Sequence, residues 1–156
     1  MKRLLYSVAW CGVLFMAACQ LTSPEADFSI IIRSGTSFGE CLGYCLTELH
    51  LDAQTIIFTR HSSDPKAYPE KRYETPMSAR QWQRLALLVD FDVLRQMQEI
   101  YGCPDCADGG AEWIDVEQDG QRKRVTFEYG DTLEPIAALI DEVRKIHDQM
   151  KEHDEP

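Results

Sequence analysis

The sequence predicts an α+β fold: a single domain over residues 28–150, in which two main helices pack on one face of an antiparallel sheet of about five strands. Two observations carry this prediction. Short β-branched segments occur in pairs that no helix separates, which favours an antiparallel sheet over a parallel one. The end of the chain then repeats apolar residues at helical spacing, which predicts a helix that covers the sheet.

Three predicted strands and their connections occupy the first part of the domain. Residues 28–33 are compact and β-branched, as is typical of a strand. Residues 44–51 alternate between polar and apolar side chains, and residues 55–60 form the return strand after a turn. The Gly- and Ser-rich stretch 34–43 between the first two strands predicts a loop or an irregular strand entry.

Residues 61–76 are polar and contain three prolines, which predicts a long loop. Long loops in compact domains are often functional or mobile. This loop is therefore the candidate contact surface, and its candidate contact residues are His61, Tyr68 and Tyr73.

Two helices follow from local signals. Ser78 and Gln81 fit a capping box, in which each side chain satisfies a free backbone N–H at the start of a helix. Residues 90–92 either interrupt this helix or begin a short second one. The last helix has Pro135 in its first turn and places apolar residues three and four apart, at Ile136, Leu139, Ile140, Val143, Ile146 and Met150.

A β-hairpin is the most specific local prediction. Asp119-Gly120 is a two-residue turn of the type that needs positive φ at both positions. This turn places Glu117 opposite Arg122 and Asp115 opposite Arg124 on one face, where opposite charges favour the register. The other face carries the residues predicted to be buried: Ile114, Val116, Val125, Phe127 and Tyr129.

The first residues predict export from the cytosol. Lys2 and Arg3 precede an apolar run, residues 4–18, that is too short for an ordinary membrane-spanning helix of about 20 residues. Met16-Ala17-Ala18-Cys19 resembles the lipobox of bacterial lipoproteins, in which the signal is cut before the cysteine and that cysteine is acylated. The resemblance implies that Cys19 is the lipid-attachment site. A plain signal peptide cut elsewhere is the alternative.

The predicted boundaries follow from this reading: a signal peptide at 1–18, a lipid-anchored tether at 19–27 and a frayed polar tail at 151–156. Because Gln20 follows the cysteine, sorting as in enterobacteria implies the outer membrane, with the domain facing the periplasm. The chain carries a formal net charge of −10, so nucleic acid is not an expected partner.

Four cysteines remain in the domain: Cys41, Cys45, Cys103 and Cys106. An oxidising compartment favours two disulfides, but the spacing leaves all three pairings open. A Cys41–Cys45 bond requires a bend, which Gly43 permits, because a regular strand holds such residues too far apart. A zinc site with four thiolates is the second interpretation. In the third, the C-P-x-C pair at 103–106 resembles the active site of glutaredoxins.

The stretch Gly39-Glu40-Cys41-Leu42-Gly43-Tyr44, followed by two strands, resembles a second bacterial pattern. Small secreted and lipid-anchored proteins carry a domain of unknown function with a G-x-C-P-x-Y motif of this kind. Leu42 stands where that family usually has proline. The likeness covers residues 28–150, and it implies a fold and a compartment but no activity.

No group of side chains converges on a recognisable catalytic set, so we expect a protein that is not an enzyme. The sequence predicts a lipid-anchored envelope protein that acts as a binding or structural module, with another envelope protein as its candidate partner. No motif predicts a cofactor or a metal site. The alternative is a thiol-active or metal-binding envelope protein that uses the four cysteines.

Overall fold

A computed structural model describes residues 29–152 and has an α+β fold. Six strands form one antiparallel sheet in the order β4-β3-β2-β1-β5-β6. The strands are β1 (Ile30–Ser37), β2 (Tyr44–Leu51), β3 (Thr55–Ser62), β4 (Lys71–Pro76), β5 (Ala111–Gln118) and β6 (Gln121–Glu128). The helices are α1 (Ala79–Ala86), α2 (Phe91–Gln96) and α3 (Ala137–Glu152), with short 3-10 turns at η1 (Cys106–Asp108) and η2 (Glu134–Ile136).

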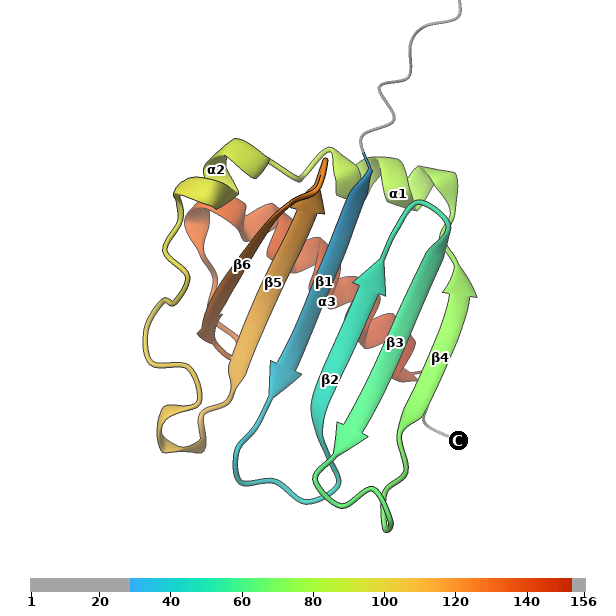
Figure 1. Ribbon diagram of the computed structural model, residues 1–156, viewed down its shortest axis with the longest axis vertical. Helices are drawn as coiled ribbons and strands as arrows, with labels where there is room; N and C mark the ends of the chain where they lie inside the picture. Colours follow the sequence, from blue (N-terminus) through green and yellow to red (C-terminus); the bar gives the residue numbers. More distant parts are fainter. Residues whose placement is uncertain (1–28, 153–156) are drawn as a thin grey trace, which may run out of the picture.

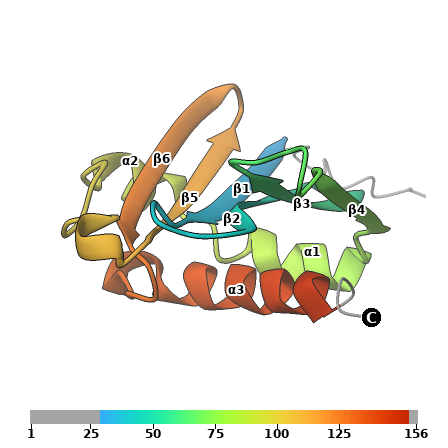
Figure 2. The same ribbon diagram turned by 90° about the horizontal axis from the view of Figure 1, so that it is seen from below.

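The molecule has two layers. All three helices lie on one side of the sheet or at its end, and α3 runs diagonally behind the strands (Figures 1 and 2). We call the side that α3 covers the helix-covered face and the opposite side the open face. Within residues 29–152, no helix combines the length and the apolar character that crossing a bilayer requires.

The helix-covered face contains the hydrophobic core. Alternate residues of β1, β2, β3, β5 and β6 point toward the helices, because successive strand residues face opposite sides of a sheet. The inner residues of these helices, among them Leu85, Leu139 and Ile146, are almost completely buried against them. The strands contribute Ile32, Leu49, Leu51, Ile56, Phe58, Ile114, Val116, Val125 and Phe127 to the same cluster.

The predicted hairpin is confirmed in its turn and its register. Asp119 and Gly120 have φ values of 52° and 75°, as a turn with two positive φ angles requires. Glu117 lies opposite Arg122 and Asp115 opposite Arg124. One predicted core residue is wrong: Tyr129 lies beyond the end of β6 and is 51 % exposed.

The sheet has one strand more than predicted, and the domain has three helices where two main helices were predicted. Residues 71–76, which we expected in a loop, form β4 along the edge of β3. Tyr73 packs on Phe58, with ring centroids 6.5 Å apart, so a long-range contact supports a strand whose own pattern is weak. Pro76 is tolerated because it ends an edge strand. Ser34–Ser37, expected in a loop or an irregular strand entry, continue β1 because β2 and β5 pair with it from both sides.

Both disulfides brace the same end of the sheet, which we call the loop end; it is the lower end in Figure 1. Cys41–Cys45 closes the β1–β2 connection, where Gly43 supplies the bend with a φ of 91°. Cys103–Cys106 closes the loop before β5. The backbone N–H of Gly39 donates to Asp105 (3.1 Å), so the two braced loops contact each other.

Candidate ligand-binding site

A pocket of about 240 Å³ opens between α3 and the helix-covered face, toward the loop end. The pocket is lined by residues from three strands or their ends and from one helix. Its lining comes from the second half of β1, the start of β5, the residues after β6 and the middle of α3. The polar side chains in this lining are those of Ser34, Thr36, Glu112, Tyr129, Arg144, His147 and Asp148.

An ion pair forms one wall of the pocket. Arg144 on α3 donates from Nε to Glu112 Oε1 (2.9 Å) and from Nη2 to Oε2 (2.7 Å). Arg144 Nη2 also donates to the carbonyl oxygen of Asp131 (2.6 Å), and the Gly130 N–H donates to Glu112. The hydrogen bond to Glu112 raises the pKa of Arg144. Glu112 is buried, so this bidentate pair neutralises two charges that the interior would otherwise disfavour.

A hydrogen-bonded row of neutral groups forms the opposite wall. Thr47 Oγ1 lies 2.8 Å from Thr36 Oγ1 and 2.9 Å from His147 Nε2. The imidazole also packs edge-on against Phe58 at 5.1 Å between ring centroids. Burial lowers the pKa of His147, although the carboxylate of Asp148 acts in the opposite direction. His147 is therefore neutral at pH 7.

The Ser34 hydroxyl is a free polar group in this lining. Ser34 is buried, with a relative exposure of 5 %. Its side chain makes no hydrogen bond to any other residue between 29 and 152. Tyr129 lies at the mouth, half exposed, with its ring edge-on to Phe38. A hydroxyl without a partner beside a hollow is suited to a ligand or a water molecule.

The lining combines a pair of opposite charges with neutral hydrogen-bonding groups. Glu112 and Arg144 are paired with each other, the imidazole is neutral, and the exposed carboxylate of Asp148 lies 3.6 Å from His147 Nδ1. Apart from that carboxylate, the pocket offers hydroxyls, a neutral ring nitrogen and one aromatic ring, which match a small uncharged polar molecule better than an anion.

The four domain cysteines lie apart from this pocket's lining. Their Cα atoms are 5.7 Å apart in Cys41–Cys45 and 5.5 Å apart in Cys103–Cys106, so both pairings are local. No group of three or more His, Cys, Asp and Glu side chains in residues 29–152 is placed to hold a metal ion. The redox interpretation requires a helix N-terminus at the first cysteine, because this lowers the pKa of the thiol. Only a three-residue turn with a left-handed Ala107 follows Cys103.

The three candidate contact residues do not share one loop. His61 belongs to β3, where Nε2 lies 3.1 Å from Glu48 and Nδ1 lies 3.1 Å from Glu70. Tyr68 is on the short connection between β3 and β4 and is 42 % exposed. Tyr73 is on β4 and packs toward the core, so its assignment to a contact loop is wrong. The cause is the long-range pairing of β4, which shortens the predicted loop to residues 63–70.

Sequence reasoning missed the pocket altogether, and it placed the lipid site outside the described residues, at Cys19. Ser34 and Thr36 were assigned to a loop, and Glu112 and Arg144 are 32 positions apart in the chain. The only available signal was polar residues on otherwise apolar faces: Arg144 and His147 lie on the same helix as the buried Val143 and Ile146.

Comparison with known proteins adds no function to this site. No protein-family model matches the sequence, and no curated protein sequence matches it. Two resemblances therefore stay predictions: that of residues 16–19 to a lipobox and that of residues 28–150 to a domain of unknown function.

Proposed function

We propose that the protein is a lipid-anchored, periplasm-facing module of the bacterial envelope that is not an enzyme and that binds a small uncharged polar molecule in the pocket beneath α3. The observation that carries binding is the lining itself, in which Ser34 is buried without a partner while the charges of Glu112 and Arg144 are paired. The sequence at residues 2–19 supports the location.

The position of the pocket is consistent with attachment at Cys19. β1 begins at the end of the sheet opposite the loop end (Figure 1), and the pocket opens toward the loop end. A tether over residues 19–27 can span at most about 30 Å at about 3.5 Å per residue. The domain would thus stay close to the bilayer while the pocket faces the periplasm.

Binding is tested with a pair of substitutions on one strand. Ser34→Val removes the hydroxyl and places methyl groups in the pocket, whereas Ser37→Val makes the same change outside the lining. Amide NMR spectra of the detergent-solubilised full chain are recorded with a panel of sugars, amino acids and organic anions. We expect an uncharged polar compound to shift the amide signals of residues 34–36 and 130. Ser34→Val should weaken the binding of that compound at least tenfold. Equal binding by both variants would show that the pocket is not the site.

The location and the absence of thiol chemistry have separate tests. Cys19→Ala should move the protein from the membrane fraction to the soluble fraction, with a mass that lacks acyl chains. Alkylation of the wild-type protein without reductant should block none of the four domain cysteines. Rapid labelling of Cys103 or Cys106, both exposed, would instead favour thiol exchange.

A further inference from the structure

The open face of the sheet contains an arginine that lies flat on a tryptophan. The guanidinium carbon of Arg124 on β6 is 3.9 Å from the ring centroid of Trp113 on β5. Trp113 is only 6 % exposed although no helix covers this side. The stack is therefore a built feature, in which one large side chain is buried by another within a solvent-facing sheet.

Gly35 of β1 is what allows the indole to lie there. A Cβ atom at this position would meet the six-membered ring of Trp113 and the carbonyl oxygen of Thr47. The indole consequently lies between the bare backbone of β1 and the guanidinium of Arg124. Any larger residue at position 35 would displace the ring, so Gly35 fixes the position of the indole on which Arg124 stacks.

Arg124 has no acceptor for its donors. It makes no hydrogen bond or ion pair with any residue of the described range 29–152. Asp115, its partner across the strands, instead accepts from Arg122 Nε at 2.8 Å and lies 3.9 Å from Arg33 Nη1. Burial lowers the pKa of Arg124, against the attraction of Asp115, yet an arginine stays protonated at neutral pH.

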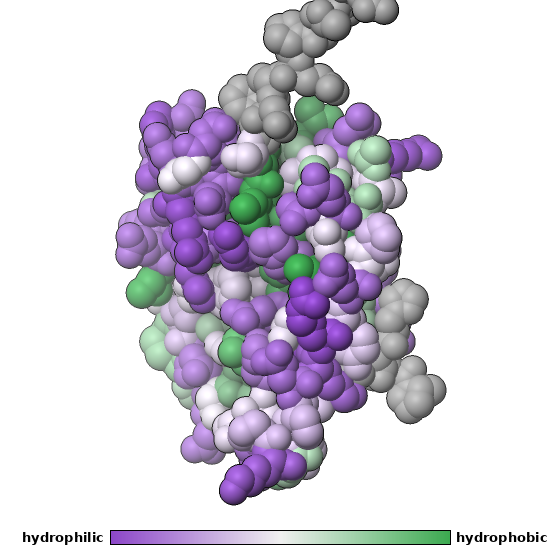
Figure 3. Space-filling view, turned by 45° about the vertical axis from the view of Figure 1, so that its right-hand side comes forward, coloured by the Kyte–Doolittle hydropathy of each residue, from purple (hydrophilic) through white to green (hydrophobic). Residues whose placement is uncertain are grey.

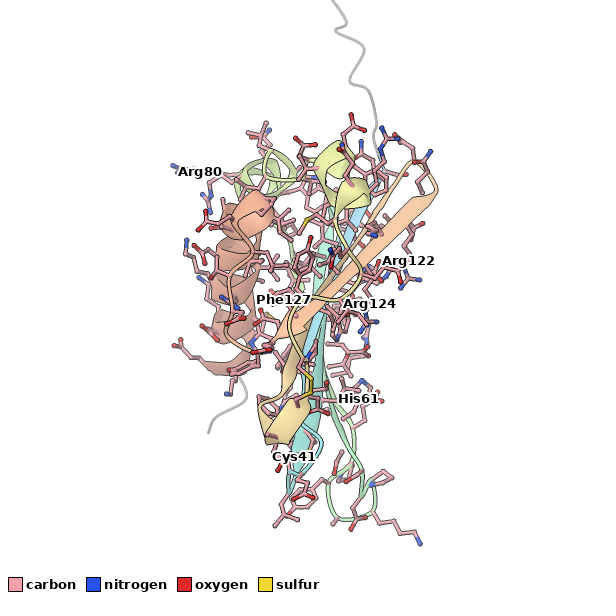
Figure 4. The ribbon with its side chains drawn as sticks, turned by 90° about the vertical axis from the view of Figure 1, so that its left-hand side faces the viewer. Cys41, His61, Arg80, Arg122, Arg124 and Phe127 are labelled. Carbon is pink, nitrogen blue, oxygen red and sulfur yellow. A yellow bond between two sulfur atoms is a disulfide. The ribbon has the colours of Figure 1, made fainter. Side chains whose placement is uncertain are left out.

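Three arginines and three carboxylates share this part of the open face. Arg33, Arg122 and Arg124 lie near Asp115, Glu117 and Glu48, where Arg33 Nη2 donates to Glu117 (3.0 Å) and Glu48 attracts Arg124 without a hydrogen bond. Figure 4 shows the side chains of Arg122 and Arg124 together on the side of the sheet that faces away from α3. Five N–H donors held in a plane match a carboxylate, which can accept two of them in parallel.

A groove of about 210 Å³ adjoins the stack. It shares Trp113 with Arg124 and is otherwise lined by β1, β2 and β3, including Arg33, His50, Ile57 and Thr59. Glu48 also lines it, but its carboxylate is paired with His61. In the space-filling view, which brings the β4 edge of the sheet forward, the hydrophobic areas are small and separate (Figure 3).

We propose that the Trp113–Arg124 stack is a second binding site, in which Arg124 binds the carboxylate of a small organic anion and the adjoining groove takes the organic part. This site is distinct from the pocket beneath α3, lies on the opposite face and does not depend on that pocket's function. Arg124 is exposed, so binding replaces water at its donors with a carboxylate that matches the planar fork, which is the physical reason for affinity. The sources of such a carboxylate include a free metabolite and the end of a peptide.

The probes are N-acetylphenylalanine, its carboxamide and inorganic phosphate, titrated into the full chain in detergent. The readout is the NMR signals of the Trp113 indole N–H and the Arg124 Nε–H. We expect the carboxylate to shift both signals saturably, the carboxamide to shift neither, and the amides of residues 34–36 and 130 to stay unchanged. Equal shifts from carboxylate and carboxamide, or shifts from phosphate alone, would overturn the proposal.

Two variants assign the effect to Arg124. Arg124→Gln should weaken binding of N-acetylphenylalanine about tenfold to a hundredfold, the range expected for a hydrogen bond to a charged group. Arg124→Lys keeps the charge but loses the planar fork, so we expect it to bind N-acetylphenylalanine more weakly than wild type and more tightly than Arg124→Gln. This variant also tests the assignment if Arg124→Gln fails to fold. Arg72→Gln, on the same face but paired with Glu74, is the matched control and should bind like wild type. Unchanged binding by Arg124→Lys and Arg124→Gln would refute the assignment.

Discussion

The two faces of the sheet are buried by different physical means. The helix-covered face is apolar and packs against α1 and α3, with Phe58 and Phe127 completely buried. The open face has no helix, yet Asp115 is 1 % exposed there, because arginines from both neighbouring strands cover it. Figure 4 shows Phe127 between the layers and Arg122 and Arg124 on the far side. One face thus gains stability from apolar area, and the other gains order from charge and stacking.

This contrast teaches where ligand sites can lie. A close-packed apolar face leaves space only where it ends, and the pocket beneath α3 lies at such an end, with Glu112, Arg144 and His147 around it. A charged face can bind a ligand wherever a charged side chain has no hydrogen-bond partner within the protein. On the open face, within residues 29–152, Arg124 makes no hydrogen bond, and the buried Nη1 of Arg33 is a second such donor.

The largest effect should come from the apolar face. Phe127→Ala removes a fully buried ring and leaves a cavity, so we expect the free energy of unfolding to fall by about 3–5 kcal/mol. Thr126→Ala, next to it but on the open face, should cost less than about 0.5 kcal/mol. Urea denaturation measures both. A loss below about 1 kcal/mol for Phe127→Ala would mean that α3 does not pack as described.

An intermediate effect should come from the charged face. Asp115→Asn keeps the shape of the side chain but leaves Arg33 and Arg122 with Glu117 alone. We expect a loss of about 1–3 kcal/mol, less than for a fully buried pair because Arg122 is more than half exposed. Glu74→Gln breaks an exposed pair with Arg72 and should change stability by less than about 0.5 kcal/mol. Equal effects of both substitutions would show that Asp115 is no more than a surface charge.

The smallest effect should appear in the pH dependence of stability. Burial holds the pKa of His147 in the folded protein below the value of 6.5 that an exposed histidine has. The unfolded chain therefore binds a proton that the folded chain resists, so the free energy of unfolding falls as pH decreases from 7 through 6.5. Asp148 attracts this proton and Lys151 repels it, but burial outweighs both.

His147→Gln should flatten this dependence between pH 7.5 and 5.0, measured by urea denaturation at each pH. His50→Gln, a ring on the open face beside Asp52, is the control and should leave the slope closer to that of the wild type. If the slope changes with His50 and not with His147, the open face carries the pH dependence of the protein.

Part of the molecule could be predicted because the cause lies within a few residues. The Asp119-Gly120 turn, the register of its hairpin and the start of α1 at Ser78 depend on backbone conformation and on neighbours in the chain. The charges of the hairpin were predicted to pair directly across the strands. In the structure, Arg122 binds Asp115 diagonally, Arg33 binds Glu117, and Arg124 turns to Trp113.

By itself, the sequence determined the α+β class, the hairpin and the last helix, because turn chemistry and hydrophobic periodicity act locally. Only the tertiary structure decided that β4 exists and that β1 lies between β2 and β5. This strand order brings Gly35 beneath Trp113 and Ser34 toward Arg144. Both candidate sites depend on contacts between residues far apart in the chain, and such contacts form only when long-range pairing and burial offset the entropy of ordering them.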